Sequence, residues 1–208
     1  EWPRCVRNTY PTDSIARVLL AIAILVSSNV HARILDVPVP IPTIQAALLG
    51  AMPHDTIRVA AGAVVDVPND LSISVHALTL LSGDPRALLR NLSHSGTSTI
   101  VIHADSCRIE GFAMYCRSGS VIRILASASG TSIQGNEIYA AAAFGGVGVY
   151  DSGVSTRVVG NIFHYGANAV WAEGTRTVIE ANEFPDGVRA IAVSGDAVIR
   201  GNNIRGQQ

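Results

Sequence analysis

Hydrophobic and polar positions repeat along the C-terminal half of this chain. In each unit apolar residues first alternate with polar ones, a small residue follows, and another apolar residue stands three positions later. The small residues are at positions 111, 135, 160, 181 and 201, so successive units are 20 to 25 residues long. A repeat of this length, with a short strand in each unit, is typical of a solenoid in which neighbouring units stack.

Two apolar columns of the repeat predict which side chains are buried. Alternation with polar positions predicts a strand with one face toward the core. The column two positions before the small residue contains Ile109, Ile133, Val158, Ile179 and Ile199. The column three positions after it contains Met114, Ile138, Phe163, Phe184 and Ile204. We expect both columns to point inward.

An asparagine directly follows the small residue in four of the five units. The small residue lets the chain turn, and asparagine tolerates the left-handed backbone of a tight corner. In stacked units these side chains would form an internal ladder. The four residues are Asn136, Asn161, Asn182 and Asn202.

The repeat units favour strands over helices. They contain too many Gly, Ser and β-branched residues for a helical repeat, which would also need apolar positions three and four apart. The pattern therefore predicts an all-β parallel β-helix whose coils pair about 4.8 Å apart. Upstream, Thr43–Leu49 is amphipathic, with Thr43 as its cap and Gly50 as its end, and predicts a short helix. We expect this helix to cover the apolar end of the first coil.

The N-terminal entry and the repeats together resemble a known superfamily. Residues 43–47 and 55–62, followed by the Gly-Asn-x-Ile/Phe units, are similar to right-handed parallel β-helix proteins of the pectin-lyase-like superfamily, which includes NosD-like periplasmic proteins. The resemblance extends over roughly residues 40–208 and implies a right-handed parallel β-helix solenoid. It implies no single activity, because the superfamily contains lyases, hydrolases, esterases, epimerases and non-enzymes.

The first 32 residues predict export. Arg17 precedes the apolar run 18–26, and small residues stand where a signal peptidase would cleave after Ala32. Nine apolar residues are too few to span a bilayer, and a buried helix is the alternative. We expect residues 1–32 to comprise an upstream segment and a signal peptide, and residues 33–208 to form one β-helix domain in a periplasmic, cell-surface or secreted protein. The last small residue, Gly201, leaves too little chain for a cap, so we expect the natural domain to continue.

Composition limits the chemistry. The net charge of −1 gives no support for a nucleic-acid partner, and all 15 cationic residues are Arg, which excludes a lysine base or Schiff base. Cys107 and Cys116 lie within one coil, where they would either pair in an oxidising compartment or be small buried residues. No Cys/His cluster has the spacing of a structural metal site, so no cofactor is expected, apart from the calcium considered below.

The candidate binding residues come from two successive coils. The motifs of the enzymatic superfamily members are absent, so the resemblance transfers no catalytic residue. Asp151 and Glu173 follow equivalent strands, and two carboxylates stacked on one face could bind Ca²⁺ or divide acid and base roles. Tyr150 and Trp171 would offer sugar-stacking surfaces beside them. The alternatives are solvated carboxylates in turns and a Trp171 inside the core. His164, at a corner, is typical of a surface residue.

The sequence thus leads to three functional hypotheses. The first is an exported β-helix repeat protein that contacts polysaccharide without a catalytic motif. The second is a polysaccharide lyase or hydrolase that uses Asp151, Glu173 and a neighbouring Arg. The third is a NosD-like accessory protein for metal-site maturation.

Overall fold

The computed structural model describes residues 31–93, 96, 98–141, 145–186 and 189–205. The chain divides into a unit of Glu1–His31 and a larger unit of Ala32–Gln208, and the description below concerns the larger unit. The predicted signal peptide therefore lies outside the described residues, apart from its last two positions.

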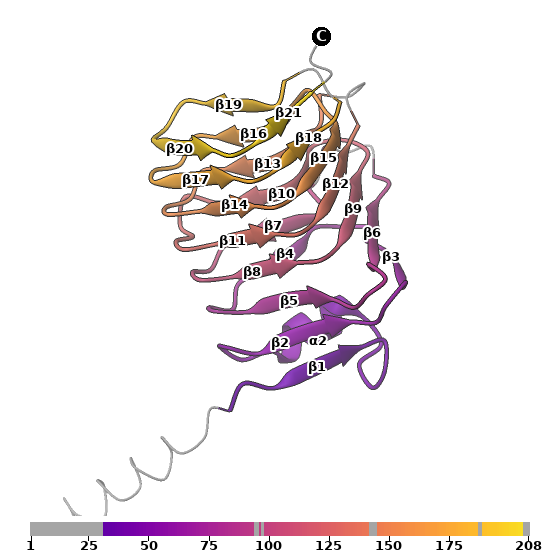
Figure 1. Ribbon diagram of the computed structural model, residues 1–208. Helices are drawn as coiled ribbons and strands as arrows, with labels where there is room; N and C mark the ends of the chain where they lie inside the picture. The colour runs from indigo at the N-terminus through magenta and orange to yellow at the C-terminus, as the bar shows by residue number, and fades with distance from the viewer. Residues whose placement is uncertain (1–30, 94–95, 97, 142–144, 187–188, 206–208) are drawn as a thin grey trace, which may run out of the picture. The chain divides into compact units, whose positions relative to one another are not determined.

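The larger unit is a right-handed parallel β-helix, as the repeat predicted (Figure 1). The chain runs through one strand of each of three parallel sheets and then begins the next coil. Sheet A consists of β1 (Ile34–Val37), β2 (Thr56–Val59), β5 (Thr79–Ser82), β8 (Arg108–Glu110), β11 (Ser132–Gln134), β14 (Arg157–Val159), β17 (Thr177–Glu180) and β20 (Ala197–Arg200). Sheet B consists of β3 (Val64–Asp66), β6 (Leu88–Asn91), β9 (Ala113–Cys116), β12 (Glu137–Ala140), β15 (Ile162–Tyr165), β18 (Glu183–Phe184) and β21 (Asn203–Ile204). Sheet C consists of β4 (Leu71–Ile73), β7 (Ile100–Ile102), β10 (Ser120–Ile124), β13 (Val147–Asp151), β16 (Asn168–Ala172) and β19 (Ile191–Val193).

The short helix α2 (Ile44–Gly50) covers the N-terminal end of the core. Its cap is Thr43, whose hydroxyl oxygen accepts a hydrogen bond from the Ala46 N–H at 3.1 Å. Ile44 and Ala47 are fully buried, and the helix contacts β1, β2 and β4. The predicted capping helix is therefore confirmed, and it shields apolar side chains that the first coil would otherwise expose to water.

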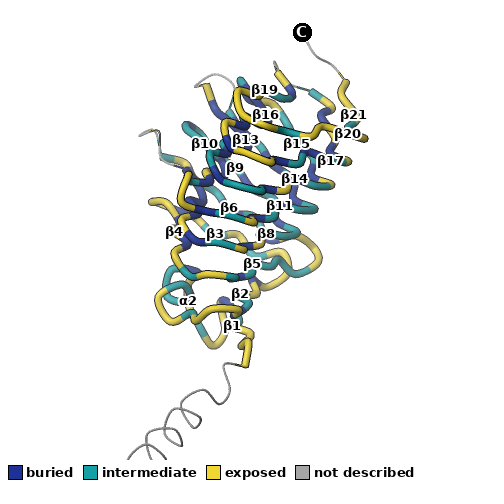
Figure 2. Tube along the Cα trace, turned by 90° about the vertical axis from the view of Figure 1, so that its left-hand side faces the viewer, coloured by how far each residue is buried: buried dark blue, intermediate teal, exposed yellow. Residues whose placement is uncertain are grey.

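Both predicted apolar columns point inward until the last coil. Ile109, Ile133, Val158 and Ile179 stand in register and are fully buried, as are their counterparts from Met114 to Phe184. Phe163 and Phe184 stack with ring centroids 5.1 Å apart. Ile199 and Ile204 continue the columns but are 48% exposed, because the described residues place no further coil against them (Figure 2).

The asparagines form the expected internal ladder. The Asn161 side-chain oxygen accepts from the backbone N–H of Asn136 at 2.9 Å and from the Asn136 amide group at 3.1 Å. The same pair of bonds links Asn161 to Asn182 and Asn182 to Asn202. Each side-chain amide also donates to a backbone carbonyl, as Asn161 does to Ile133 at 2.9 Å. The ladder thus satisfies buried polar groups at the corner between sheets A and B.

At this corner it is the small residue whose backbone is left-handed. The expectation that the asparagine would adopt this conformation is wrong. Gly135 and Gly160 have φ of 62° and 64°, whereas the ladder asparagines are not among the residues with positive φ. Ala181 takes the same conformation with φ of 55°. Glycine adopts it without strain because it has no Cβ.

The two cysteines form no disulfide within the described residues. Cys107 and Cys116 are both fully buried, and burial raises the pKa of both thiols. Of the two alternatives, the structure supports the small buried residue.

Replacing Ile133 by aspartate should unfold or aggregate the protein. The charge would be buried between coils without a partner, at a cost above about 4 kcal/mol. Circular dichroism and size-exclusion chromatography would measure the loss. Ser132→Asp, one position away on the outward side, is the matched control and should remain folded; a soluble, folded Ile133→Asp variant would contradict the register.

Gly160→Ala and Ala181→Gly should change stability in opposite directions. A Cβ at Gly160 would meet no atom within 4 Å, so the change tests backbone strain alone and should cost about 1 kcal/mol. Ala181→Gly removes that strain at the equivalent corner and should gain about 0.5 kcal/mol after the entropy of the unfolded glycine is subtracted. Urea denaturation would measure both, and changes of the same sign would disprove the strain argument.

Candidate functional site

The outward side of sheet C carries a column of three large side chains. The strand register places Arg123 of β10 beside Tyr150 of β13, and Tyr150 beside Trp171 of β16. Alternation along each strand turns these residues outward, whereas Ile124 and Ala172 face the core. Trp171 is therefore not a core residue, and the predicted neighbourhood of Tyr150 and Trp171 is confirmed.

These residues contact each other through their rings and charges. The Tyr150 and Trp171 rings are nearly perpendicular, with centroids 5.7 Å apart and an interplanar angle of 71°. The Arg123 guanidinium lies 5.6 Å from the centre of the Tyr150 ring. The Tyr150 hydroxyl donates to the Glu173 carboxylate, and this bond raises the pKa of Tyr150. Arg123, Tyr150, Trp171 and Glu173 are called the aromatic face below.

Asp151 does not belong to this face, and the predicted pair of stacked carboxylates is wrong. Its side chain is fully buried, because it follows Tyr150 in the strand and points to the opposite side. It accepts hydrogen bonds from the Thr156 and Thr177 hydroxyls at 2.9 and 2.6 Å and from the Gly153 N–H at 2.9 Å. Asp151 thus joins neighbouring coils from within and cannot share a calcium ion or a substrate with the exposed Glu173.

Sheet B carries a second polar cluster, which the sequence did not reveal. Glu137 and Tyr139 extend from β12, and His164 extends from β15 beside Tyr139. Glu137 accepts from the Tyr139 hydroxyl, from His164 Nε2 at 3.1 Å and from Arg86 at 3.0 Å. On its other side, His164 Nδ1 lies 3.7 Å from Asp186. We call these five residues the Glu137 cluster.

The electrostatics of the Glu137 cluster follow from these contacts. The hydrogen bond from Tyr139, with help from His164 and Arg86, lowers the pKa of Glu137. The same bond to the Glu137 carboxylate, together with burial, raises the pKa of Tyr139 to about 12. The Tyr139 and His164 rings stack at 4.5 Å with an interplanar angle of 9°, so they cover each other's faces. The stack covers one face of each ring, and the polar atoms of both rings bind Glu137.

One signal in the sequence could have found part of this cluster. Tyr139 and His164 each follow the inward apolar residue of the second column, so aligned units place them side by side. Arg86 and Asp186 come from segments outside the repeat pattern, and only the folded coils bring them to Glu137.

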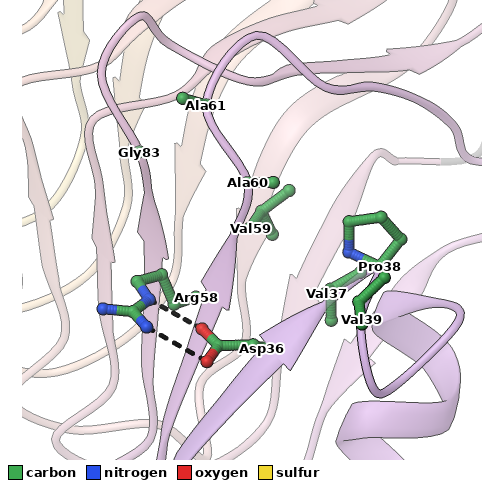
Figure 3. Close-up of a pocket in the computed structure, with 9 residues that line it drawn as sticks. All are labelled: Asp36, Val37, Pro38, Val39, Arg58, Val59, Ala60, Ala61 and Gly83. Atoms are coloured by element: carbon green, nitrogen blue, oxygen red, sulfur yellow. Dashed lines mark hydrogen bonds and ion pairs between the residues drawn. The ribbon is translucent and has the colours of Figure 1, made fainter.

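A hollow lies near the N-terminal end of the β-helix (Figure 3). It has a volume of about 520 Å³ and lies between the Pro38–Val39 segment and the end of β2. Its walls are mainly apolar, and its ionic groups, Asp36 and Arg58, pair with each other at 2.7 and 3.0 Å. No predicted site residue lines this pocket.

The described residues contain neither a cluster of metal-binding side chains nor a membrane-spanning helix. No three His, Cys, Asp or Glu side chains in this part of the chain gather closely enough to enclose a metal ion. No helix in the same part has the length and apolarity to cross a membrane.

Comparison with known proteins supports the fold. No protein-family model matches the chain, and no curated protein matches its sequence. Among solved structures, the β-helix is similar to an alginate lyase from Paenibacillus sp. str. FPU-7, with a TM-score of 0.55 and 19% sequence identity. The match covers 82% of this chain and 75% of the lyase. At this identity the likeness establishes the shared parallel β-helix fold and leaves the activity open.

Tyr139 should ionise only near pH 12, about two units above an ordinary tyrosine. Removing the acceptor charge with Glu137→Gln should return the midpoint toward 10. Because the folded-state pKa is the higher one, the stabilisation from this bond is complete below about pH 10 and is lost as pH rises toward 12. NMR titration of the tyrosine Cζ carbons, assigned with Tyr139→Phe, would measure it. An unshifted Tyr139 in the wild type would disprove the bond.

Proposed function

We propose that this chain is an exported protein that binds polysaccharide on the aromatic face of sheet C, without catalysis at that face. The observation that carries the proposal is the outward column of Arg123, Tyr150 and Trp171. Sugars bind to aromatic rings through apolar C–H surfaces and to charged side chains through their hydroxyl groups. The aromatic face offers both kinds of contact within three adjacent coils.

The ring geometry favours sheet C over sheet B as the sugar platform. The perpendicular rings of Tyr150 and Trp171 cannot cover each other's faces, so a ring face remains for a ligand. The parallel rings of Tyr139 and His164 each cover one face of the other, and the polar atoms of both rings bind Glu137. An aromatic platform needs an open ring face, which supports the aromatic face as the binding surface.

Two other observations support the proposal. The similar β-helix is that of an alginate lyase, a protein whose name gives a polysaccharide as its substrate. The signal-peptide pattern in the first 32 residues fits a protein that meets polysaccharide outside the cytoplasm. The lyase or hydrolase hypothesis loses its proposed acid–base pair, because Asp151 is buried on the opposite side of the strand from Tyr150.

Trp171→Ala should weaken polysaccharide binding at least tenfold, equivalent to about 1.4 kcal/mol. Affinity gel electrophoresis with alginate, polygalacturonate and dextran, followed by titration calorimetry with the best binder, would measure the change. Tyr165→Ala is the matched control, since Tyr165 is 58% exposed but stands at the end of a sheet B strand. The proposal fails if no polysaccharide binds, or if Tyr165→Ala weakens binding as much as Trp171→Ala.

A further inference from the structure

An imidazole nitrogen and a carboxylate oxygen lie close together at the edge of the Glu137 cluster. His164 Nδ1 and Asp186 Oδ2 are 3.7 Å apart. The distance is too long for a hydrogen bond. In a neutral imidazole one nitrogen carries the proton and the other has a lone pair that can accept a hydrogen bond or bind a metal. The proton position on His164 therefore decides what this pair of atoms can bind.

Glu137 decides the position of that proton. Its carboxylate pairs with the Arg86 guanidinium at 3.0 Å and accepts a hydrogen bond from the Tyr139 hydroxyl, so its oxygens act as acceptors in this cluster. His164 Nε2, at 3.1 Å from this carboxylate, must therefore carry the proton and donate. In the neutral imidazole the lone pair is then on Nδ1, directed toward Asp186. A carboxylate behind a histidine is the usual way in which proteins orient a metal-binding imidazole.

Both facing groups are held in place. His164 is fixed by its bond to Glu137 and by its stacking on Tyr139, and its side chain is only 20% exposed. Asp186 accepts a hydrogen bond from the Tyr165 N–H through Oδ1 at 2.8 Å, which leaves Oδ2 for a ligand. Two fixed electron-pair donors that face each other repel unless a cation lies between them.

We propose that His164 Nδ1 and Asp186 Oδ2 chelate a divalent transition-metal ion of the Zn²⁺ class. Zn²⁺ binds imidazole nitrogen and carboxylate oxygen at about 2.0–2.2 Å, so tetrahedral angles place two such donors about 3.4 Å apart. The observed 3.7 Å requires only a small side-chain adjustment. The nitrogen donor disfavours Ca²⁺ and Mg²⁺, which prefer oxygen ligands.

The site has two protein ligands, and water would complete the coordination. It is thus open and should exchange its metal, unlike a closed structural site with four protein ligands. The ion would join β15 to the segment after β18 in the next coil. A ligand that binds the folded protein alone raises its thermal midpoint, so the metal should stabilise these coils. This inference does not depend on polysaccharide binding.

The chain contains a matched control pair. His76 Nδ1 and Asp105 Oδ2 are 3.8 Å apart, almost the same distance as in the proposed site. There, however, His76 Nδ1 accepts a hydrogen bond from the Asp105 N–H at 3.3 Å, so its lone pair is in use. Both side chains are also well exposed, at 66% and 46%. If proximity of His and Asp were sufficient, this pair would bind metal too.

The test is titration of the full chain, without an affinity tag, with ZnCl₂ at pH 7.5 by calorimetry and by thermal denaturation. We expect one site that raises the thermal midpoint, loss of that site in His164→Ala, and at least tenfold weaker binding in Asp186→Asn. Glu137→Gln should weaken binding about 10- to 100-fold by removing the carboxylate behind the imidazole. His76→Ala should bind as the wild type does, and CaCl₂ should have no effect.

Three results would overturn the proposal. Absence of Zn²⁺ binding by the wild type would mean that the pair holds only a proton, as an ion pair. Unchanged Zn²⁺ binding in a folded His164→Ala variant would show that the metal binds elsewhere. An equal loss of Zn²⁺ affinity in His76→Ala and His164→Ala would show that the effect is not specific to this site. If circular dichroism shows that Glu137→Gln does not fold, the Asp186→Asn variant still tests the proposal. Asp186 is 42% exposed, so its replacement leaves no buried charge and the variant should fold.

Discussion

The asparagine ladder is the interaction on which the stacking of the C-terminal coils depends. At the corner between sheets A and B the chain must turn, and its buried backbone N–H groups need acceptors there. Asn161, Asn182 and Asn202 supply those acceptors, each to the backbone of the preceding coil. The ladder therefore aligns one coil with the next from Phe112 to Asn202, where it supports the register of the neighbouring strands.

Because the strand register is fixed, residues at equivalent positions of successive repeat units form continuous surfaces on each sheet. Residues 20 to 25 positions apart become neighbours on one face, as Tyr150 and Trp171 do on sheet C and Tyr139 and His164 do on sheet B. The two faces differ because the first pair of rings is perpendicular and the second is parallel. The first pair is the proposed surface for a sugar, whereas the polar atoms of the second pair form a network with Glu137.

The sequence predicted the coils well, because equivalent positions of successive repeat units indicate which residues pair between neighbouring strands. It predicted the candidate site only in part. Tyr150 and Trp171 lie within strands, where alternation decides the face. The strand register pairs Asp151 with the buried Ala172 and not with Glu173, so matching the two carboxylates placed Asp151 on the wrong side of its strand. Arg86 and Asp186 approach Glu137 from segments outside the repeat, and no spacing in the sequence encodes that approach.

The aromatic face and the proposed metal site share coils, although they lie on different sheets. The coil of β14, β15 and β16 carries both His164 and Trp171, and the next coil leads from β17 to Asp186 and β19. Core residues such as Phe163 and Phe184 fill the space between the sheets. Closely packed interiors transmit displacement, so a metal ion joining these two coils on sheet B would also limit the movement of Trp171 on sheet C.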